Sequence, residues 1–145
     1  MRAVIQRVKQ ADVKINNTIV GEINQGLLIL LAVHKDDTVD KIKKLTDKII
    51  NLRIFSGEDE KMNLSIKDIS GEILIVSQFT LYGDSTKGNR PSFIDSAKPI
   101  KAIPYYEQFV ERMKSSGLKV ATGKFGAMMD VNLINDGPVT IIIEN

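Results

Sequence analysis

Polar side chains interrupt an apolar segment in the middle of the chain. The segment reads ILIVSQFTLY, so Ser77, Gln78 and Thr80 stand within what is otherwise the pattern of a core strand. Buried hydroxyl and amide groups need hydrogen-bond partners, and serine and threonine can find them across a sheet. A functional site is the alternative, because a long basic loop follows the segment directly. The residues alone leave both interpretations open.

A second polar sequence, Asn135-Asp136-Gly137-Pro138, separates two short β patterns near the C-terminus. Asp-Gly between alternating strands is typical of a hairpin turn. Pro138 is unusual there, because proline has no N–H to donate to a sheet and belongs at an edge or a strand start. The carbonyl groups of Asp136 and Gly137 would then point outward, where a ligand could use them. The pattern favours the turn and leaves the ligand site as the alternative.

Most familiar patterns of catalytic and metal-binding residues are missing. With no Cys and only one His, His34, the chain has neither a cysteine nucleophile nor a multi-histidine metal site. No G-x-S-x-G elbow accompanies His34, which we interpret as a surface residue before a helix. Neither phosphate-binding loop, G-x-x-x-x-G-K-[ST] or G-x-G-x-x-G, occurs, which argues against nucleotide hydrolysis and dinucleotide binding. We therefore expect no metal and no cofactor.

Basic residues gather in two places. The first is a predicted helix whose lysines alternate with Asp40, Asp47 and apolar positions, which is typical of a solvated helix face. The second is the loop from Gly83 to Lys101, which has no sustained period. Loops of this length are usually functional or disordered. Its cations are Lys87, Arg90, Lys98 and Lys101, and phosphate contacts by the first three are our expectation.

The elements that must position these residues are mostly short strands. Apolar residues alternate or run in strand lengths over 3–8, 13–15, 19–23, 27–33, 73–82, 120–125, 128–134 and 139–143. Asn16-Asn17 offers a turn before the third of these segments. Helical spacing links Val39 to Leu52, with Asp37 or Thr38 as a cap. A second helical pattern has Pro104 near its start and Gly117 just past its end, and Tyr106, Phe109, Val110 and Met113 make its apolar face. Strands before, between and after two helices predict an α+β fold with a largely antiparallel sheet.

Length and composition place the chain among globular proteins. Its 145 residues suggest one domain, residues 1–145. With 43% hydrophobic and 26% charged residues and a net charge of +2, it is neither disordered nor a polycation. Arg2 and Arg7 interrupt the N-terminal apolar pattern, which argues against a signal peptide. The longest apolar run, Leu27 to Val33, is too short for a membrane helix. A soluble, cytoplasmic protein is expected.

Two blocks of this sequence closely resemble the signature motifs of the D-aminoacyl-tRNA deacylases. They are VSQFTLYGD (Val76 to Asp84) and NDGPVT (Asn135 to Thr140). Three further blocks, GNRPSF, RIFSGEDEKMNLS and IQRV, are also similar to that family, and all five lie in family order along the whole chain. Two signatures with three supporting blocks are far more specific than one short motif.

The resemblance implies a hydrolase that cleaves the ester between a D-amino acid and the terminal ribose of tRNA. It also implies removal of glycine from non-cognate tRNA. The implied protein is a homodimer with a barrel-like α+β fold, no cofactor and no metal. Its expected partners are the acceptor end of D-aminoacyl-tRNA and a second copy of itself, with neither DNA nor a membrane among them.

The resemblance also implies roles for individual residues. The catalytic pocket is expected at Ser77, Gln78, Phe79 and Thr80, where backbone N–H groups orient the ester and the ribose 2′-hydroxyl helps to activate water. An aminoacyl ester is already activated, so positioning matters more than a strong base. Substrate-binding residues near the adenosine are expected to be Ala102, Phe125 and Met129.

Chiral selection is expected from Gly137 and Pro138. The resemblance implies a cis peptide bond between them and insertion of this dipeptide into the pocket of the partner subunit, with Arg7 bracing the loop. Their carbonyl groups would bind the α-ammonium of the substrate, so that L-aminoacyl-tRNA is rejected and the side chain stays in solvent. Two alternatives remain: a module that binds the tRNA acceptor end without turnover, and a covalent esterase that uses Ser77 or Thr80.

Overall fold

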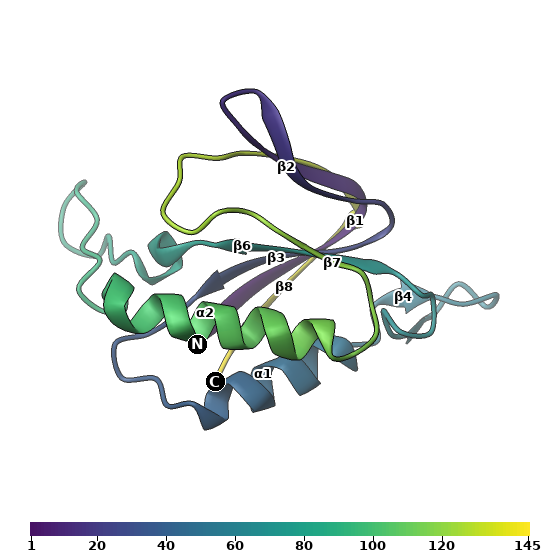
Figure 1. Ribbon diagram of the computed structural model, residues 1–145. Coiled ribbons are helices and arrows are strands. Elements are labelled where there is room, and N and C mark those ends of the chain that lie inside the picture. The colour runs from purple at the N-terminus through teal and green to yellow at the C-terminus, as the bar shows by residue number, and fades with distance from the viewer.

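Six strands form one curved sheet, and two helices cover one of its faces (Figure 1). The computed structural model describes residues 1–145. The strands of the main sheet are β1 (Arg2–Ile15), β2 (Thr18–Ile23), β3 (Gly26–Ala32), β6 (Glu72–Ser77), β7 (Val120–Thr122) and β8 (Asp130–Glu144). A separate ribbon consists of β4 (Phe55–Ser56) and β5 (Met62–Leu64). The fold is α+β, as the sequence predicts.

Strand β1 is the central strand of the sheet. On one side its N-terminal part pairs with β3 and its C-terminal part with β2, and on the other side it pairs with β8 along nearly its whole length. All three pairings are antiparallel. The expected turn between β1 and β2 is present, because Asn16 and Asn17 adopt φ angles of 50° and 63°, which a tight hairpin requires.

Strands β3, β6 and β7 pair in parallel, which the sequence pattern does not indicate. Helix α1 (Asp40–Ile50) connects β3 to β6, and helix α2 (Pro99–Lys114) connects β6 to β7. Parallel neighbours need a crossover of a dozen or more residues, and each helix is part of such a crossover. The sheet is therefore mixed, with antiparallel pairs in the majority.

The sheet curves until its two edges nearly meet. At β2 a Cβ atom on Gly21 would lie 2.6 Å from the carbonyl oxygen of Thr122 in β7. That separation excludes any side chain, so glycine permits the close approach of the two edges. The larger apolar core fills the space between the sheet and the helices, around Phe109 and Met113. A smaller core on the opposite face surrounds Leu74, so both faces of the sheet are packed.

Both helices differ from the sequence prediction at their first residues. Neither Asp37 nor Thr38 caps α1, which has no side-chain cap. Helix α2 begins at Pro99, whose fixed φ angle suits the first helical position, and Pro104 lies inside the helix. The buried face of α2 contains the four predicted residues, Tyr106, Phe109, Val110 and Met113, and Ala102 in addition. No helix is long and apolar enough to cross a membrane.

The buried carboxylate of Asp37 is the centre of a cluster of charged and hydrogen-bonding groups. Its carboxylate accepts hydrogen bonds from the Met1 ammonium at 2.7 Å, Lys41 Nζ at 3.0 Å and the backbone N–H of His34 at 2.6 Å. Burial opposes the charged form of Asp37, but these hydrogen bonds outweigh burial and hold its pKa below the ordinary value. The cluster ties the start of β1 to the start of α1.

We expect the substitution Asp37→Asn to lower the free energy of unfolding by about 3 kcal/mol, because it leaves the buried Met1 ammonium and the partly buried Lys41 without their counter-charge. Since the pKa of Asp37 is lowered by folding, its stabilisation is complete above the ordinary pKa of about 3.9 and is lost as the pH falls below it. Urea unfolding at pH 7 and pH 3 measures both effects. The control Asp40→Asn removes an exposed pair with Lys44 and should cost under about 1 kcal/mol.

Candidate functional site

Strand β6 ends at Ser77, and the chain turns there into a short 3-10 helix, η1 (Phe79–Tyr82). The prediction of one strand through Tyr82 is therefore wrong. Its neighbour β3 ends at Ala32, and the last sheet-like bond runs from the N–H of Gln78 to the carbonyl of Leu31 at 2.8 Å. Beyond that point no strand offers a partner, so the backbone bonds locally instead.

The turn into η1 leaves two backbone donors free. The first hydrogen bond of η1 runs from the N–H of Leu81 to the carbonyl of Gln78, at 3.2 Å. The N–H groups of Phe79 and Thr80 precede it and have no acceptor within the turn, as at the start of any helix. Two adjacent N–H groups beside a cavity can stabilise an oxygen that gains negative charge.

The side chains at the start of this turn lie at the surface of the molecule. Gln78 Nε2 donates a hydrogen bond to Oγ1 of Thr80, and Thr80 is exposed. The Phe79 ring is 55% exposed and meets the ring of Phe93 edge to face, with 5.2 Å between their centroids. An aromatic side chain that exposed is available to a planar ligand.

A cavity of about 410 Å³ opens beside η1. This volume lies in the range of small-ligand sites, and most of the residues that line it are apolar. They come from the end of β3, from Ser77 and Phe79, from the loop before α2, from α2 itself and from the loop after β7: Leu31, Ala32, Val33, Ser77, Phe79, Phe93, Ser96, Ala97, Lys98, Pro99, Ala102, Tyr106, Phe125 and Gly126.

The structure brings together most of the residues expected in the pocket. Ser77, Phe79, Ala102 and Phe125 line one cavity, and Gln78 and Thr80 do not line it but adjoin Phe79 in the chain. Met129 does not line it and packs against the smaller apolar core instead. The sequence did not predict the lining residues from the loop before α2. The one signal for them is that Phe93 lies within the family-like block GNRPSF.

No carboxylate or imidazole lines the cavity. Its ionisable groups are Lys98 and Tyr106. The Tyr106 hydroxyl donates to the carbonyl of Ile75 at 2.9 Å, and burial raises the pKa of Tyr106 to about 12. Tyr106 is therefore neutral at physiological pH and already hydrogen-bonded. The cavity offers binding and orientation rather than a side-chain base.

Gly137 and Pro138 lie in a bulge of β8 rather than in a hairpin turn. The residues on both sides of the bulge pair with β1 in the same antiparallel direction, and Gln6 pairs with Thr140 while Val8 pairs with Asn135. The favoured turn interpretation is thus wrong, because the chain never reverses. Extra residues on one strand must bulge out of the ladder, and they expose Gly137 and Pro138. Their peptide bond is cis, as expected.

Two side chains hold the bulge in place. Arg7 Nε donates to the carbonyl of Asp136 at 3.0 Å, and Arg7 Nη1 donates to the carbonyl of Ile54 at 2.6 Å. Asn135 closes the base of the bulge, because its Oδ1 accepts the N–H of Val139 at 2.9 Å. Arg7 is 12% exposed. The expected bracing of this loop by Arg7 is therefore present.

Within one chain the bulge lies far from the cavity. Arg7, opposite the bulge, pairs with Leu27, whereas Ser77 pairs with Leu31, which pairs with Ala3. Four residues along the sheet and three strands across it correspond to roughly 20 Å. One chain therefore cannot bring Gly137 and Pro138 to its own Ser77.

Known proteins similar to this chain share its full length. Residues 4–144 match the family model described as D-Tyr-tRNA(Tyr) deacylase. A D-aminoacyl-tRNA deacylase from Thermosipho africanus is 59% identical over 100% of this chain and 97% of its own length. Another, from a Geobacillus species, is 55% identical over 100% of this chain and 95% of its own.

Two solved structures are similar to this fold. One, titled c-Myc DNA Unwinding Element Binding Protein, has a TM-score of 0.94 and 39% identity and covers 100% of this chain and 99% of its own. The other, a probable eukaryotic D-amino acid tRNA deacylase, has a TM-score of 0.85, covers 98% of this chain and 97% of its own, and at 18% identity shows the fold alone.

Proposed function

This chain belongs to the D-Tyr-tRNA(Tyr) deacylase family and is a D-aminoacyl-tRNA hydrolase, and we propose that its site is shared between two subunits and uses the substrate's own RNA in catalysis. The observation that best supports this proposal is the cavity beside the free N–H groups of Phe79 and Thr80. Water attacks the ester carbonyl, the ribose oxygen leaves, and the products are a D-amino acid and tRNA.

The cavity holds the terminal adenosine of tRNA in this proposal. Its apolar walls suit a purine, and the rings of Phe79 and Phe125 line it. Stacking of a base on an aromatic ring contributes about 1–3 kcal/mol. With the adenosine in the cavity, the attached ester lies at the turn between Ser77 and Thr80.

The ester is activated by hydrogen bonds rather than by an acidic or basic side chain. The N–H groups of Phe79 and Thr80 donate to the carbonyl oxygen as negative charge develops there, and Ser77 and Gln78 shape the pocket. Because no carboxylate or imidazole lines the cavity, the 2′-hydroxyl of the terminal ribose positions the attacking water. Oriented donors of this kind contribute about 3–4 kcal/mol each to transition-state stabilisation.

A second copy of the chain completes the site. Strand β8 pairs only with β1, so its other edge is free, and Ile134 and Ile142 on it are 48% and 68% exposed. A long free edge with exposed apolar side chains favours association. In a homodimer Gly137 and Pro138 of one subunit enter the pocket of the other, which resolves their separation from Ser77 within one chain.

Chirality is read at the α-ammonium of the substrate. Backbone carbonyl groups of Gly137 and Pro138 accept hydrogen bonds from it and exclude the L configuration, while the amino-acid side chain extends into solvent. Glycine has no side chain to place, so glycyl-tRNA is also accepted. Different D-amino acids are accepted for the same reason, since a close-fitting side-chain pocket could not hold both tyrosine and aspartate.

Hydrolysis of D-Tyr-tRNA and L-Tyr-tRNA tests the proposed function. We expect the D-ester to lose its amino acid with catalytic amounts of protein and the L-ester to survive. Persistence of both esters at excess protein, with tRNA still bound, would show a binding module without turnover.

The substitution Thr80→Ala separates the proposed mechanism from covalent catalysis. Thr80 Oγ1 is hydrogen-bonded by the amide of Gln78, and no base is near to take its proton. We expect the variant to deacylate D-Tyr-tRNA within about threefold of the wild-type rate, because its backbone N–H is unchanged. A loss of a thousandfold, or a trapped acyl-enzyme on Thr80 in the wild type, would contradict this mechanism.

A further inference from the structure

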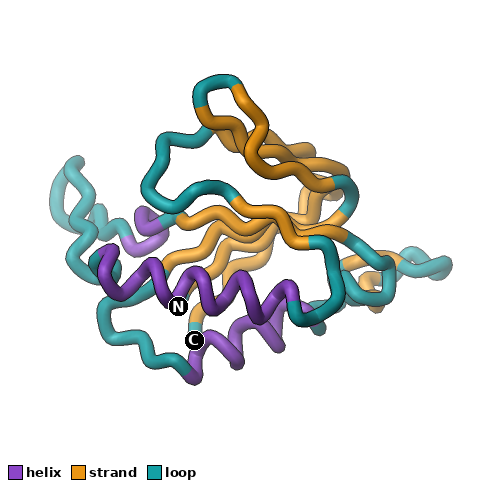
Figure 2. The backbone as a smooth tube through the Cα atoms, viewed as in Figure 1, coloured by secondary structure: helices purple, strands orange, loops and turns teal.

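The long loop before α2 forms a projecting arm, residues 84–92. A single antiparallel bridge closes its base, where Asp84 and Ser92 exchange two backbone hydrogen bonds of 2.8 Å. Residues 84–91 are all exposed. Figures 1 and 2 show the arm extending from the body of the molecule on the side of η1 and of the first turn of α2. The arm is thus a defined protrusion next to the proposed site.

The base of the arm is fixed to the wall of the cavity. Phe93 follows the bridge directly, lines the cavity and packs against Phe79. Asp95 accepts a hydrogen bond from Lys35 Nζ at 2.7 Å, and its carbonyl accepts the N–H of Lys35 at 2.9 Å. These contacts hold the segment that follows the bridge, so the base of the arm has a fixed place beside the cavity.

The tip of the arm carries cations without carboxylate partners. Lys87 and Arg90 make no ion pair, whereas lysines on α1 pair with aspartates of the same helix, such as Lys43 with Asp47. The carboxylate of Asp84, at the base, is bound by the N–H of Thr86 at 2.9 Å, which lowers its pKa. The charge of the tip is therefore free to meet an anion from outside.

Two further cations without ion pairs lie at the cavity or next to it. Lys98 lines the cavity, and Lys124 directly precedes the lining residue Phe125 in the chain. About four residues separate the bridge from the tip, so the arm reaches at most roughly 13 Å from its base. That reach exceeds the spacing of successive phosphates on a nucleic-acid strand, about 3.4 Å along a duplex axis.

We propose that the arm binds the sugar-phosphate backbone of the tRNA strand whose terminal adenosine occupies the cavity, with Lys87 and Arg90 each contacting a phosphate. This inference rests on the proposed function. The contacts carry no sequence information, so they serve every tRNA that bears a D-amino acid. They position the acceptor end before the ester reaches the turn at Phe79.

Binding of uncharged tRNA at a series of salt concentrations tests the arm without requiring turnover. The double variant Lys87→Ala/Arg90→Ala should bind about tenfold more weakly at low salt. Its slope of log affinity against log salt should be shallower by about 1.5, because each phosphate contact contributes about 0.7–0.9. The charge-conserving variant Lys87→Arg/Arg90→Lys should keep the wild-type slope.

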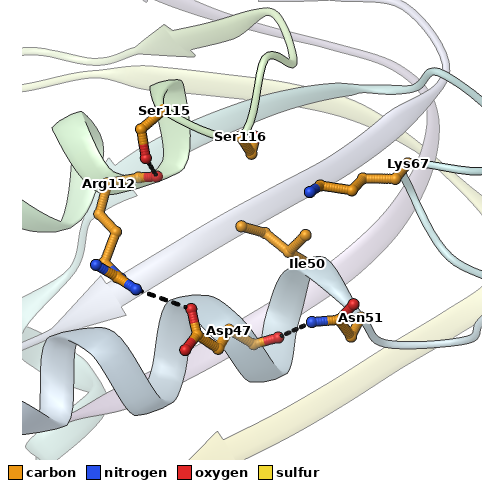
Figure 3. A pocket seen from close by; sticks show the side chains of 7 residues that line it. All are labelled: Asp47, Ile50, Asn51, Lys67, Arg112, Ser115 and Ser116. Atoms are coloured by element: carbon orange, nitrogen blue, oxygen red, sulfur yellow. Dashed lines mark hydrogen bonds and ion pairs between the residues drawn. The ribbon is translucent and has the colours of Figure 1, made fainter.

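A matched control removes two unpaired cations at the other end of the molecule. Lys48 lies on α1, and Lys67 borders a polar hollow at the C-terminal ends of both helices (Figure 3), away from the arm in Figure 1. Lys48→Ala/Lys67→Ala should leave the slope unchanged. An unchanged slope in the arm variant, or an equal change in this control, would overturn the proposal.

Hydrolysis of D-tyrosyl-adenosine, which has no phosphate, separates the arm from the active site. The arm variant should hydrolyse it at the wild-type rate while losing about tenfold in kcat/KM on D-Tyr-tRNA at low salt. Equal losses on both substrates would show that the arm only supports the cavity wall, and the proposal would fall. If the wild type hydrolyses neither D-ester, the proposed function fails, and the salt slopes still decide whether the arm binds RNA.

Discussion

Replacing Gly137 by alanine is expected to reduce kcat/KM for D-Tyr-tRNA by about a hundredfold, the typical effect of displacing a positioning group by about 1 Å. The φ angle of Gly137 is +131°, which residues with a side chain rarely adopt. A Cβ atom there would lie 2.9 Å from Cγ2 of Val139 and 3.0 Å from Nη2 of Arg7. The bulge and the Arg7 side chain that holds it must therefore shift, and the carbonyl groups of the bulge no longer point in the direction needed to bind the substrate.

The control for this variant is Gly117→Ala, just past the end of α2. Gly117 also has a positive φ, +84°, but a Cβ there would have no neighbour within 4 Å. It should share the backbone strain, about 1–2 kcal/mol of stability, and keep full activity. Steady-state deacylation of D- and L-Tyr-tRNA, with thermal unfolding of both variants, measures the difference. Full activity of Gly137→Ala would contradict the role given to the bulge.

Filling the cavity should be nearly as damaging. Ala102 lies on α2, is 8% exposed and faces the cavity, so Ala102→Trp occupies the space proposed for the adenine. We expect KM for D-Tyr-tRNA to rise about 10- to 100-fold, the effect of losing base stacking, and competitive inhibition by AMP to disappear. The control Ile103→Trp changes the next residue, which is 36% exposed and does not line the cavity. Unchanged inhibition by AMP in Ala102→Trp would place the adenosine elsewhere.

The sequence indicated the apolar elements well because their pattern is local. The run over Leu27–Val33, the Asn16-Asn17 turn and the buried face of α2 all depend on neighbouring residues. The end of β6 does not. Ser77 to Tyr82 has the composition of a strand, and it stops being one only because its partner β3 ends. Strand pairing is a non-local property that one segment cannot encode.

The same reason explains the error at Gly137 and Pro138. Asp-Gly between two β patterns predicts a hairpin if the two strands pair with each other. Here both pair with β1 instead, so the four residues bulge outward and the chain continues. The family motifs pointed to Ser77–Thr80 and to Gly137-Pro138, but not to the distance that separates these two segments within one folded chain. That separation follows from the register of the strands.

Buried charge was a further property hidden from the sequence. Asp37 before a helix has the position of a cap, yet it binds the Met1 ammonium and Lys41. The N-terminal residue and residue 37 are brought together only by the folded sheet. The pocket also forms only in the folded chain, because its walls come from five separate segments. Only the motif at Ser77 to Thr80 marks its place in the sequence.

Mixing these two impaired variants, assayed with D-Tyr-tRNA far below the wild-type KM, tests the shared site most directly. Gly137→Ala keeps its pocket and Ala102→Trp keeps its bulge, so a mixed dimer pairs one intact pocket with one intact bulge. After unfolding and refolding an equal mixture, statistical assembly of a two-fold dimer should restore about a quarter of the wild-type D-Tyr-tRNA deacylase activity. Activity no higher than that of the separate variants, with mixed dimers shown by native mass spectrometry, would contradict a site shared between subunits.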